Sequence, residues 1–257
     1  MGEAATDTRR ELAGKVVLVT GGARNIGRAI ATALAAAGAG VMVNARSSIA
    51  AAGETVALIT EAGGRAESFV TDITEPRGVE ALVAATVERF GRLDVLVHNA
   101  AVRAEQPFDS ISFEQWRHIL AVILDGAFLS AQACLPHLRQ SDSASIVHIG
   151  GETGHAGASH RAHVVAAKAG LAGFTKGLAL DLAPDRITVN CVVPGRIGTV
   201  RGMPGAPEQP AHRRAPPPIG RLGLPEEVAA MVRMLCGPDA RFVTGQSIHV
   251  NGGGLMP

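Results

Sequence analysis

The stretch Lys15-Val-Val-Leu-Val-Thr20-Gly21-Gly22-Ala23-Arg24-Asn25-Ile26-Gly27 decides the fold of this chain. A short β-branched run ends in a glycine-rich turn, which opens directly into the alanine-rich segment 28–37 and predicts a strand, a tight turn and a helix. Glycines let the backbone approach a ligand closely, and the first amides of a helix attract an anion. The junction is therefore typical of a dinucleotide site, although a well-packed turn without a ligand has the same pattern. Asn25 replaces a glycine, and asparagine tolerates left-handed backbone better than other side chains.

Strand and helix patterns alternate along the rest of the chain. Apolar runs predict further strands at 41–45, 66–71, 93–98, 145–149, 188–193 and 246–250. Helical patterns follow at 50–62, 76–90, 113–138, 165–182 and 225–236. This alternation indicates a single-domain α/β fold, a Rossmann-type doubly wound parallel sheet with helices on both faces, over residues 11–257. We expect a flexible N-terminal segment at 1–10 and a mobile excursion at 203–218, which is rich in Pro, Gly and Arg.

The composition excludes several classes of function. A net charge of +1 gives no basic or acidic excess for nucleic acid or a membrane surface. The first ten residues lack an apolar signal region, and no apolar run approaches the ~20 residues that span a bilayer. The three cysteines lack paired spacing, which indicates reduced thiols. We therefore expect a soluble, cytoplasmic protein with no nucleic-acid or membrane partner.

Further motifs follow the strands in a fixed order. Asp72-Ile73 follows the strand at 66–71, His98-Asn99-Ala100-Ala101 ends the next, and Pro194-Gly195-Arg196-Ile197-Gly198-Thr199 follows 188–193. Singly, Asp72 and Asn99 fit helix caps and Thr199 an ordinary turn. In this order, over nearly the whole chain, they resemble a short-chain dehydrogenase/reductase of the bacterial 3-oxoacyl-carrier-protein reductase type.

The resemblance implies a nicotinamide cofactor. It implies that Asp72 contacts the adenine, that Asn99 steadies the sheet and the ribose, and that Thr199 meets the carboxamide. Together with Arg24 and Arg46, whose charges are considered next, the candidate cofactor-binding residues are Thr20, Gly21, Asn25, Ile26, Gly27, Asp72, Ile73, Asn99, Ala100, Lys168, Pro194, Gly195, Ile197 and Thr199.

The charges around the second strand favour NADP(H) over NAD(H). An NAD site places an acid at the end of this strand to accept hydrogen bonds from the ribose hydroxyls. Ala45 stands there, followed by Arg46, and Arg24 lies inside the glycine-rich turn. Two guanidinium groups, at a place where no carboxylate is present, suit the 2′-phosphate of NADP(H). The alternative interpretation is that both arginines are solvated surface residues.

The catalytic pattern implied by the resemblance is broken. Family members use a tyrosine that supplies the proton, a lysine four residues later, a serine and a helical asparagine. Lys168 matches the lysine, but Val164, Gly151 and Ile123 stand at the tyrosine, serine and asparagine positions, and the chain contains no tyrosine. Because positioned acid–base help is worth about 10²–10⁴-fold, carbonyl reduction by the family mechanism should be slow or absent.

A replacement for the missing acid could come from the segment 152–163, which is rich in titratable side chains. His160 or Glu152 is the candidate replacement acid, and the alternative is that both are solvated loop residues. No third ligand supports a metal site. Lys168 can still bind ribose hydroxyls without a tyrosine.

Three interpretations of function remain open. The chain is an NADP(H)-binding oxidoreductase with altered proton delivery, or a noncatalytic cofactor-binding subunit in a mixed tetramer with an active relative, or a protein with another reaction, such as a lyase, in the same cleft. The resemblance implies a homotetramer built through the long helices. Its substrate would be a small or carrier-linked molecule, and an anionic one is indicated by Arg103, Arg196, His212, Arg213 and Arg214.

Overall fold

The computed structural model describes residues 10–199 and 216–257. The predicted flexible segment 1–10 and mobile excursion 203–218 lie outside these residues, except for Arg10 and residues 216–218. The described end of the excursion is held against the C-terminal segment, because the Ile219 amide donates to the Gly252 carbonyl (3.1 Å).

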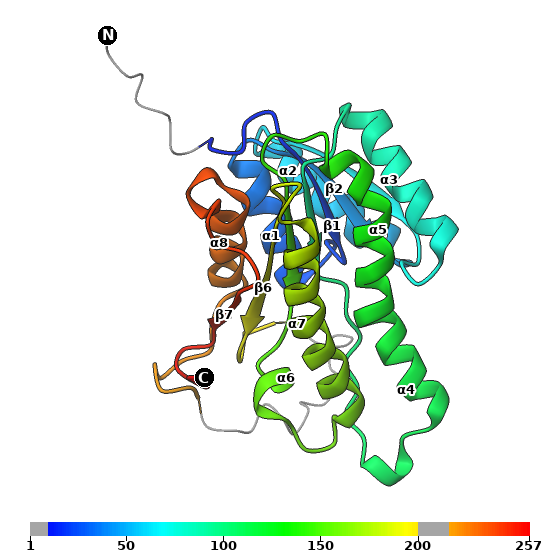
Figure 1. The fold of residues 1–257 in the computed structure, drawn as a ribbon, viewed down its shortest axis with the longest axis vertical. Helices are drawn as coiled ribbons and strands as arrows, with labels where there is room; N and C mark the ends of the chain where they lie inside the picture. The colour runs from blue at the N-terminus through cyan, green and yellow to red at the C-terminus, as the bar shows by residue number, and fades with distance from the viewer. Residues whose placement is uncertain (1–9, 200–215) are drawn as a thin grey trace.

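Seven parallel strands form one sheet in the order β3-β2-β1-β4-β5-β6-β7 (Figure 1). Their bounds are β1 Val16–Thr20, β2 Gly40–Ala45, β3 Arg65–Val70, β4 Val95–His98, β5 Ser145–Ile149, β6 Thr188–Pro194 and β7 Ser247–Val250. The order reverses between β1 and β4, and a crevice outside the carboxyl ends of the strands at such a reversal is the usual ligand site of open α/β sheets. The predicted α/β fold is confirmed.

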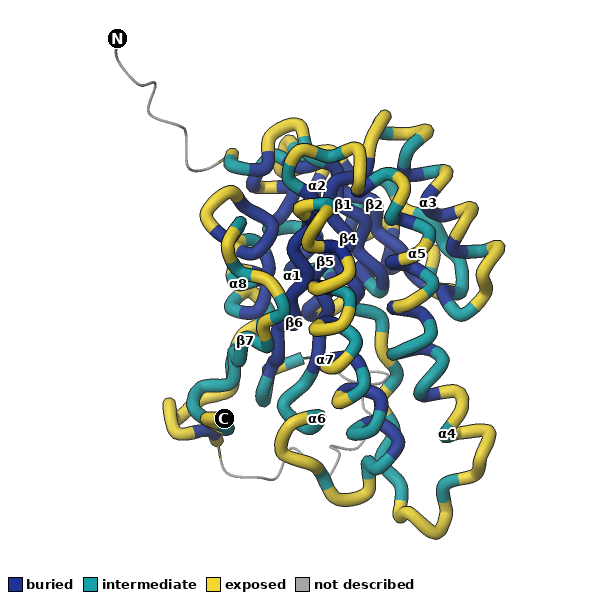
Figure 2. The backbone as a smooth tube through the Cα atoms, in the orientation of Figure 1, coloured by how far each residue is buried: buried dark blue, intermediate teal, exposed yellow. Residues whose placement is uncertain are grey.

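Helices cover both faces of the sheet, as the continuous apolar strands predicted. Alternate side chains of β1, such as Val17 and Val19, join a buried cluster with the helices α1 (Asn25–Ala36) and α8 (Pro225–Cys236). Val16 and Leu18 join a second cluster with α3 (Pro76–Phe90), α5 (Gly126–Leu138) and α7 (Ala162–Leu182). In Figure 2 the buried residues form the dark-blue stretches of backbone in the interior of the fold. The main helices are α1 Asn25–Ala36, α2 Ile49–Glu61, α3 Pro76–Phe90, α4 Phe113–Leu120, α5 Gly126–Leu138, α7 Ala162–Leu182 and α8 Pro225–Cys236.

The predicted helix 113–138 is interrupted where it passes the site. A π-helical turn, η2 (Ala121–Asp125), separates α4 from α5. Shorter helices that the sequence did not predict are α6 Thr153–Ala156, the 3₁₀ turn η1 Phe108–Ser110 and the 3₁₀ turn η4 Pro238–Ala240.

The same long helix corrects one expectation. By length and composition alone, Phe113–Leu138 could cross a membrane, because an 18-residue window within it has a mean hydropathy of 1.7. The expectation that no apolar segment approaches that length is therefore wrong. In this fold the helix packs on α3, α7, β4 and β5, which accounts for its apolar inner face.

Candidate active site

The glycine-rich turn adopts the close backbone approach that its sequence predicted. Gly21 has φ +62°, and a Cβ built on it would lie 2.9 Å from the Ala100 Cα. A Cβ on Gly27 would lie 2.1 Å from the Gly21 carbonyl oxygen. Only glycine fits either position. Asn25 has φ 50°, so it adopts the left-handed conformation for which asparagine is suited.

Asn99 ties the end of β4 to this turn. Its side-chain amide donates to the Gly21 carbonyl at 2.8 Å and to the Thr20 carbonyl at 3.2 Å. Thr20 Oγ1 in return accepts from the backbone amides of Asn99 and Ala100. The structure therefore brings these four predicted cofactor residues together at the point where the strand order reverses.

Asp72 shapes the loop after β3. Its Oδ1 accepts from the Thr74 amide (2.9 Å) and hydroxyl (2.8 Å), which satisfies a turn ahead of α3. Ile73 is 4% exposed, so it presents little side chain to a ligand. Asp72 therefore stabilises the turn that precedes α3.

Two exposed arginines, Arg24 and Arg46, place positive charge near the end of β2. Ala45 is buried, whereas Arg24 and Arg46 are exposed. Arg24 donates to Ser48 Oγ (3.2 Å), which links the glycine turn to the start of α2. Arg28 differs from them, because it is held by the Ala23 carbonyl, Thr55 and Glu54.

The segment after β6 lies at the same edge of the sheet. The Gly195 amide donates to the Val250 carbonyl (3.0 Å), and a Cβ on Gly195 would lie 2.6 Å from the Asn251 Cβ. Ile197 is buried and bridges to Gly223, and Thr199 is the last described residue before the gap. Pro194 ends β6 directly before this segment.

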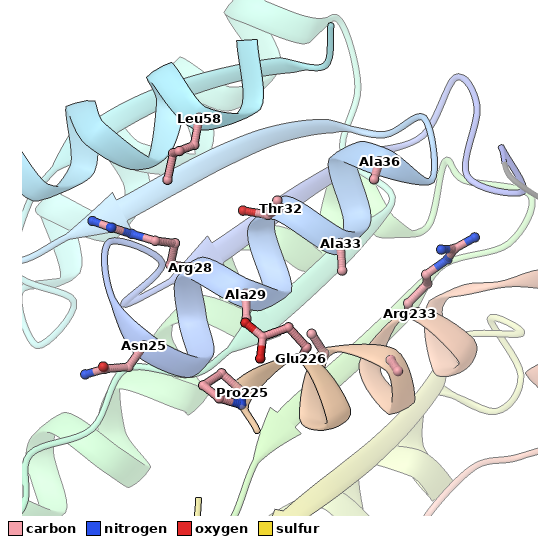
Figure 3. A pocket seen from close by; sticks show the side chains of 12 residues that line it. Asn25, Arg28, Ala29, Thr32, Ala33, Ala36, Leu58, Pro225, Glu226 and Arg233 are labelled. Carbon is pink, nitrogen blue, oxygen red and sulfur yellow. The ribbon is translucent and has the colours of Figure 1, made fainter. Parts of the chain in front are cut away.

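A groove follows α1 between α2 and α8, with Asn25 at one end and Arg28 and Arg233 along its sides (Figure 3). Arg28 has the partners described above, and Arg233 forms an ion pair with Glu11 (2.5 Å). Because Arg28 and Arg233 already interact with other residues of the protein, we assign no ligand to this groove between the helices.

Lys168 is the only one of the four expected catalytic groups in place. It is 8% exposed, and its Nζ donates to the Ile149 carbonyl (2.6 Å). Burial lowers the pKa of Lys168 to about 8; the Cys191 side chain opposes this shift and the Arg103 charge adds to it. At neutral pH the ammonium is therefore charged but much more acidic than that of a solvated lysine.

The other catalytic positions carry no proton donor. A Cβ on Gly151 would have the Thr153 hydroxyl at 3.8 Å and Lys168 Cγ at 3.9 Å as its nearest neighbours, so this position is open beside the lysine. Val164 is 7% exposed and Ile123 is fully buried, and both belong to one apolar cluster with Leu171. We call this the site cluster; its buried members are Ile119, Ile123, Ala127, Val164, Ala167 and Leu171.

The backbone around Ile123 keeps a special geometry although its side chain is inert. Ile123 is the middle residue of the π-helical turn Ala121–Asp125. Single π turns inside α-helices occur frequently at functional sites. The helix therefore keeps an irregular turn at the place where the resemblance implies an asparagine.

The candidate replacement acids do not converge on Lys168. His160 is exposed, has φ +59°, and precedes α7; its carbonyl accepts from the Gln106 amide (2.7 Å). Glu152 points towards the end of β6, because its Oε2 would lie 2.7 Å from a Cβ on Gly195 and 3.0 Å from one on Gly254.

Two buried histidines near Lys168 were not predicted from the sequence. His98 and His148 are paired across β4 and β5, with ring centroids 6.2 Å apart. Each is at most 1% exposed, and the Nε2 atom of His148 has no partner in the described residues. A histidine that interrupts an otherwise apolar strand is the signal that could have revealed them.

The hydrogen bonds of His98 indicate its tautomer. Thr20 Oγ1 already accepts from two backbone amides, so its proton is directed to Nδ1 of His98 at 3.3 Å. The ring proton of His98 is thereby assigned to Nε2. Burial lowers its pKa well below the usual range, and the nearby His148 and Lys168 lower it further.

His148 has the opposite tautomer. Thr175 donates to the Leu171 carbonyl (2.8 Å), so it accepts from Nδ1 of His148 (2.8 Å) and leaves the Nε2 of that ring unprotonated. Burial, with a contribution from Lys168, lowers the pKa of His148 to about 3. The floor of the site thus contains two neutral imidazoles beside one ammonium.

Known proteins are similar to this chain along almost its whole length. The family model described as Enoyl-(Acyl carrier protein) reductase matches residues 21–254. The chain belongs to the short-chain dehydrogenase/reductase family. It is similar to the 3-oxoacyl-[acyl-carrier-protein] reductase of Vibrio cholerae, with 37% identity over 95% of this chain and 99% of the relative. The Escherichia coli protein of the same name is 36% identical over 95% of this chain and 98% of the relative.

Solved structures agree with this membership. A dehydrogenase/reductase from Sinorhizobium meliloti superposes with a TM-score of 0.89 at 35% identity, over 97% of this chain and 98% of the other. A short-chain dehydrogenase from Burkholderia cenocepacia, solved in complex with NADP, gives 0.88 at 35% identity, over 95% and 99%. This short-chain dehydrogenase/reductase is thus an oxidoreductase by family.

Proposed function

We propose that this protein binds NADP(H) in front of Lys168 and has lost the tyrosine-dependent carbonyl reduction of its family. One observation carries the proposal: the glycine turn and Lys168 are intact, whereas Gly151, Val164 and Ile123 provide no proton donor. The neighbouring Burkholderia structure, in complex with NADP, supports the same cofactor here.

The residues present fit such a cofactor. Gly21 and Gly27 leave room that a Cβ would fill, and the first amides of α1 would bind the pyrophosphate of such a cofactor. Arg24 and Arg46 supply positive charge for a 2′-phosphate, and Lys168 supplies an ammonium for the nicotinamide ribose hydroxyls. When bound, NADPH supplies a hydride.

The residues at the tyrosine and serine positions limit acid catalysis in this site. Val164 cannot transfer a proton, and the absence of a positioned proton donor lowers the rate by about 10²–10⁴-fold. Gly151 cannot donate to a developing oxyanion, which removes about another 10²–10³-fold. A small or carrier-linked carbonyl substrate would therefore bind beside the cofactor and be reduced slowly or not at all.

The cofactor assignment has a direct test by fluorescence titration with NADPH and NADH. Arg24→Gln with Arg46→Gln should weaken NADPH binding by about 10-fold or more, because two charge-assisted contacts to the 2′-phosphate are lost. NADH binding should change little. The matched control is Arg77→Gln, an exposed arginine on α3. Failure of the wild-type chain to bind either nucleotide would refute the proposal.

A noncatalytic subunit is the second candidate, and the site cluster favours it. Apolar side chains that pack together at two former catalytic positions stabilise the fold without chemistry. Co-expression with an active relative, followed by isolation of a mixed tetramer, tests this alternative.

For the first proposed function, the assembly that we propose is a homotetramer that uses α5 and α7, in place of the mixed tetramer of the second. Phe128 on α5 is 48% exposed and Leu180 on α7 is 78% exposed, and large apolar side chains in such positions often mark interfaces. Phe128→Arg with Leu180→Arg should convert a tetramer into smaller species in size-exclusion chromatography with light scattering. Leu58→Arg on α2 should leave the mass unchanged, and a monomeric wild-type chain would contradict the proposal.

A further inference from the structure

The loop between β4 and η1 is fixed on both sides of Arg103. Val102 and Ala104 pack on the site cluster. Glu105 forms an ion pair with Arg161 (2.7 Å), in which both side chains are less than one quarter exposed. The Gln106 amide donates to the His160 carbonyl (2.7 Å), which joins the loop to the segment ahead of α7. Arg103 is therefore presented from a fixed backbone.

Arg103 belongs to an unbalanced group of charges. Its side chain is exposed, and it makes no ion pair or hydrogen bond with the residues described at 10–199 and 216–257. Surrounding protein atoms lower the pKa of Arg103, and the Arg161 charge lowers it further. Its own charge reaches Lys168, whose pKa it helps to lower. Of the cations Arg103, Arg161 and Lys168, only Arg161 forms an ion pair with a carboxylate, that of Glu105, among the described residues.

Glu152, the other carboxylate near the site, does not neutralise this excess of positive charge. The Glu152 carboxylate lies against Gly195 and Gly254, at the end of β6. Lys168 donates to a neutral carbonyl, that of Ile149. A ligand that brings a negative charge next to Arg103 would relieve the repulsion among these cations.

We infer that Arg103 binds the carboxylate of a short oxo-acid whose carbonyl group lies at the Gly151 side of Lys168. A planar guanidinium suits a carboxylate because it makes two parallel hydrogen bonds. Val102 and Ala104, the chain neighbours of Arg103, pack on the site cluster that contains Val164, and this apolar surface suits a short carbon chain. This inference rests on the proposed function for the place of the cofactor, and it names the substrate class of that site.

Acetoacetate and its neutral methyl ester distinguish a carboxylate site from an unspecific pocket. Both are titrated calorimetrically into the full chain, with and without saturating NADP⁺. Acetoacetate should bind about 10-fold or more tightly than the ester, since hydrogen bonds to charged groups are the strong ones. Arg103→Gln should abolish this preference, Arg103→Lys should keep part of it, and Arg77→Gln should keep all of it.

Each outcome bears on one claim only. If NADP⁺ binds but acetoacetate and its ester bind alike, or if Arg103→Gln retains the preference, the inference is overturned while the proposed function stands. If acetoacetate shows the Arg103-dependent preference and NADP⁺ does not bind, the proposed function fails and the carboxylate site stands. Inorganic phosphate that binds as tightly as acetoacetate would also overturn the assignment, because it would indicate a general oxyanion site.

Discussion

Gly151→Ser combined with Val164→Tyr should raise the NADPH-dependent reduction of an acetoacetyl thioester at least ~100-fold above the wild-type chain. The change returns a positioned acid, worth about 10²–10⁴-fold, and an oxyanion donor, worth about 10²–10³-fold. The measurement is the loss of NADPH absorbance with enzyme in excess of any contaminating activity.

The structure indicates that both side chains can be accommodated. The position of the serine Cβ is open, with no neighbour closer than 3.8 Å. Val164 lies one helical turn before Lys168 on α7, so a phenol there and the ammonium share one face. Tyrosine is larger than valine, and overpacking of the site cluster costs about 1–3 kcal/mol. Ile123→Asn can be added afterwards, but its amide would enter a fully buried apolar position.

The matched control replaces Val164 with phenylalanine. Gly151→Ser with Val164→Phe has the same ring without the hydroxyl, so its rate should stay near that of the wild type. A wild-type chain that reduces the thioester efficiently, and loses this activity in His160→Ala or Glu152→Gln, would show that another acid has taken over.

The sequence predicted the scaffold well because local patterns determine it. The run Val16–Thr20 and the turn at Gly21 and Gly27 are specified by β-branching and by the absence of side chains, which act within a few residues. Even the left-handed backbone of Asn25 follows from its residue type. The same reasoning correctly placed every strand of the sheet.

The site itself depends on contacts between distant segments, so much of it was beyond reach. The π turn at Ile123 has no local sequence signal, and the pairing of His98 with His148 requires knowledge that β4 and β5 are neighbours. The titratable residues of the segment 152–163 instead led to the prediction of His160 or Glu152 as the replacement acid, and His160 is exposed. The effect of the Arg103 charge on the pKa of Lys168, and the Glu105–Arg161 ion pair that holds the loop after β4, likewise join segments that are distant in the sequence.

Lys168 gives the second large expected effect, which concerns stability. Lys168→Met should stabilise the cofactor-free protein by about 3 kcal/mol at pH 7, measured by urea unfolding. Its pKa is about 8 in the folded chain against 10.5 as the ordinary value, and each unit corresponds to about 1.36 kcal/mol. Methionine keeps most of the apolar stem, although the bond to the Ile149 carbonyl is lost.

The pH dependence checks the cause of this effect. Between pH 8 and 10.5 the unfolded chain holds the Lys168 proton and the folded chain releases it, so this residue makes stability rise with pH. The buried thiols of Cys134, Cys191 and Cys236 act in the opposite direction, because burial raises their pKa values. The quantity to follow is therefore the difference between wild type and Lys168→Met, which should shrink from pH 8 to pH 10.5.

NADPH binding separates the two reasons for keeping a buried lysine. If Lys168 is retained for the cofactor, Lys168→Met should weaken NADPH binding by about 10-fold or more while it stabilises the free protein. A variant that is more stable and binds NADPH as well as the wild type would contradict the role of Lys168 in the proposed site. A variant that is less stable would show that the Ile149 hydrogen bond outweighs the cost of the buried charge. The residue is thus expected to trade stability for binding, as functional sites commonly do.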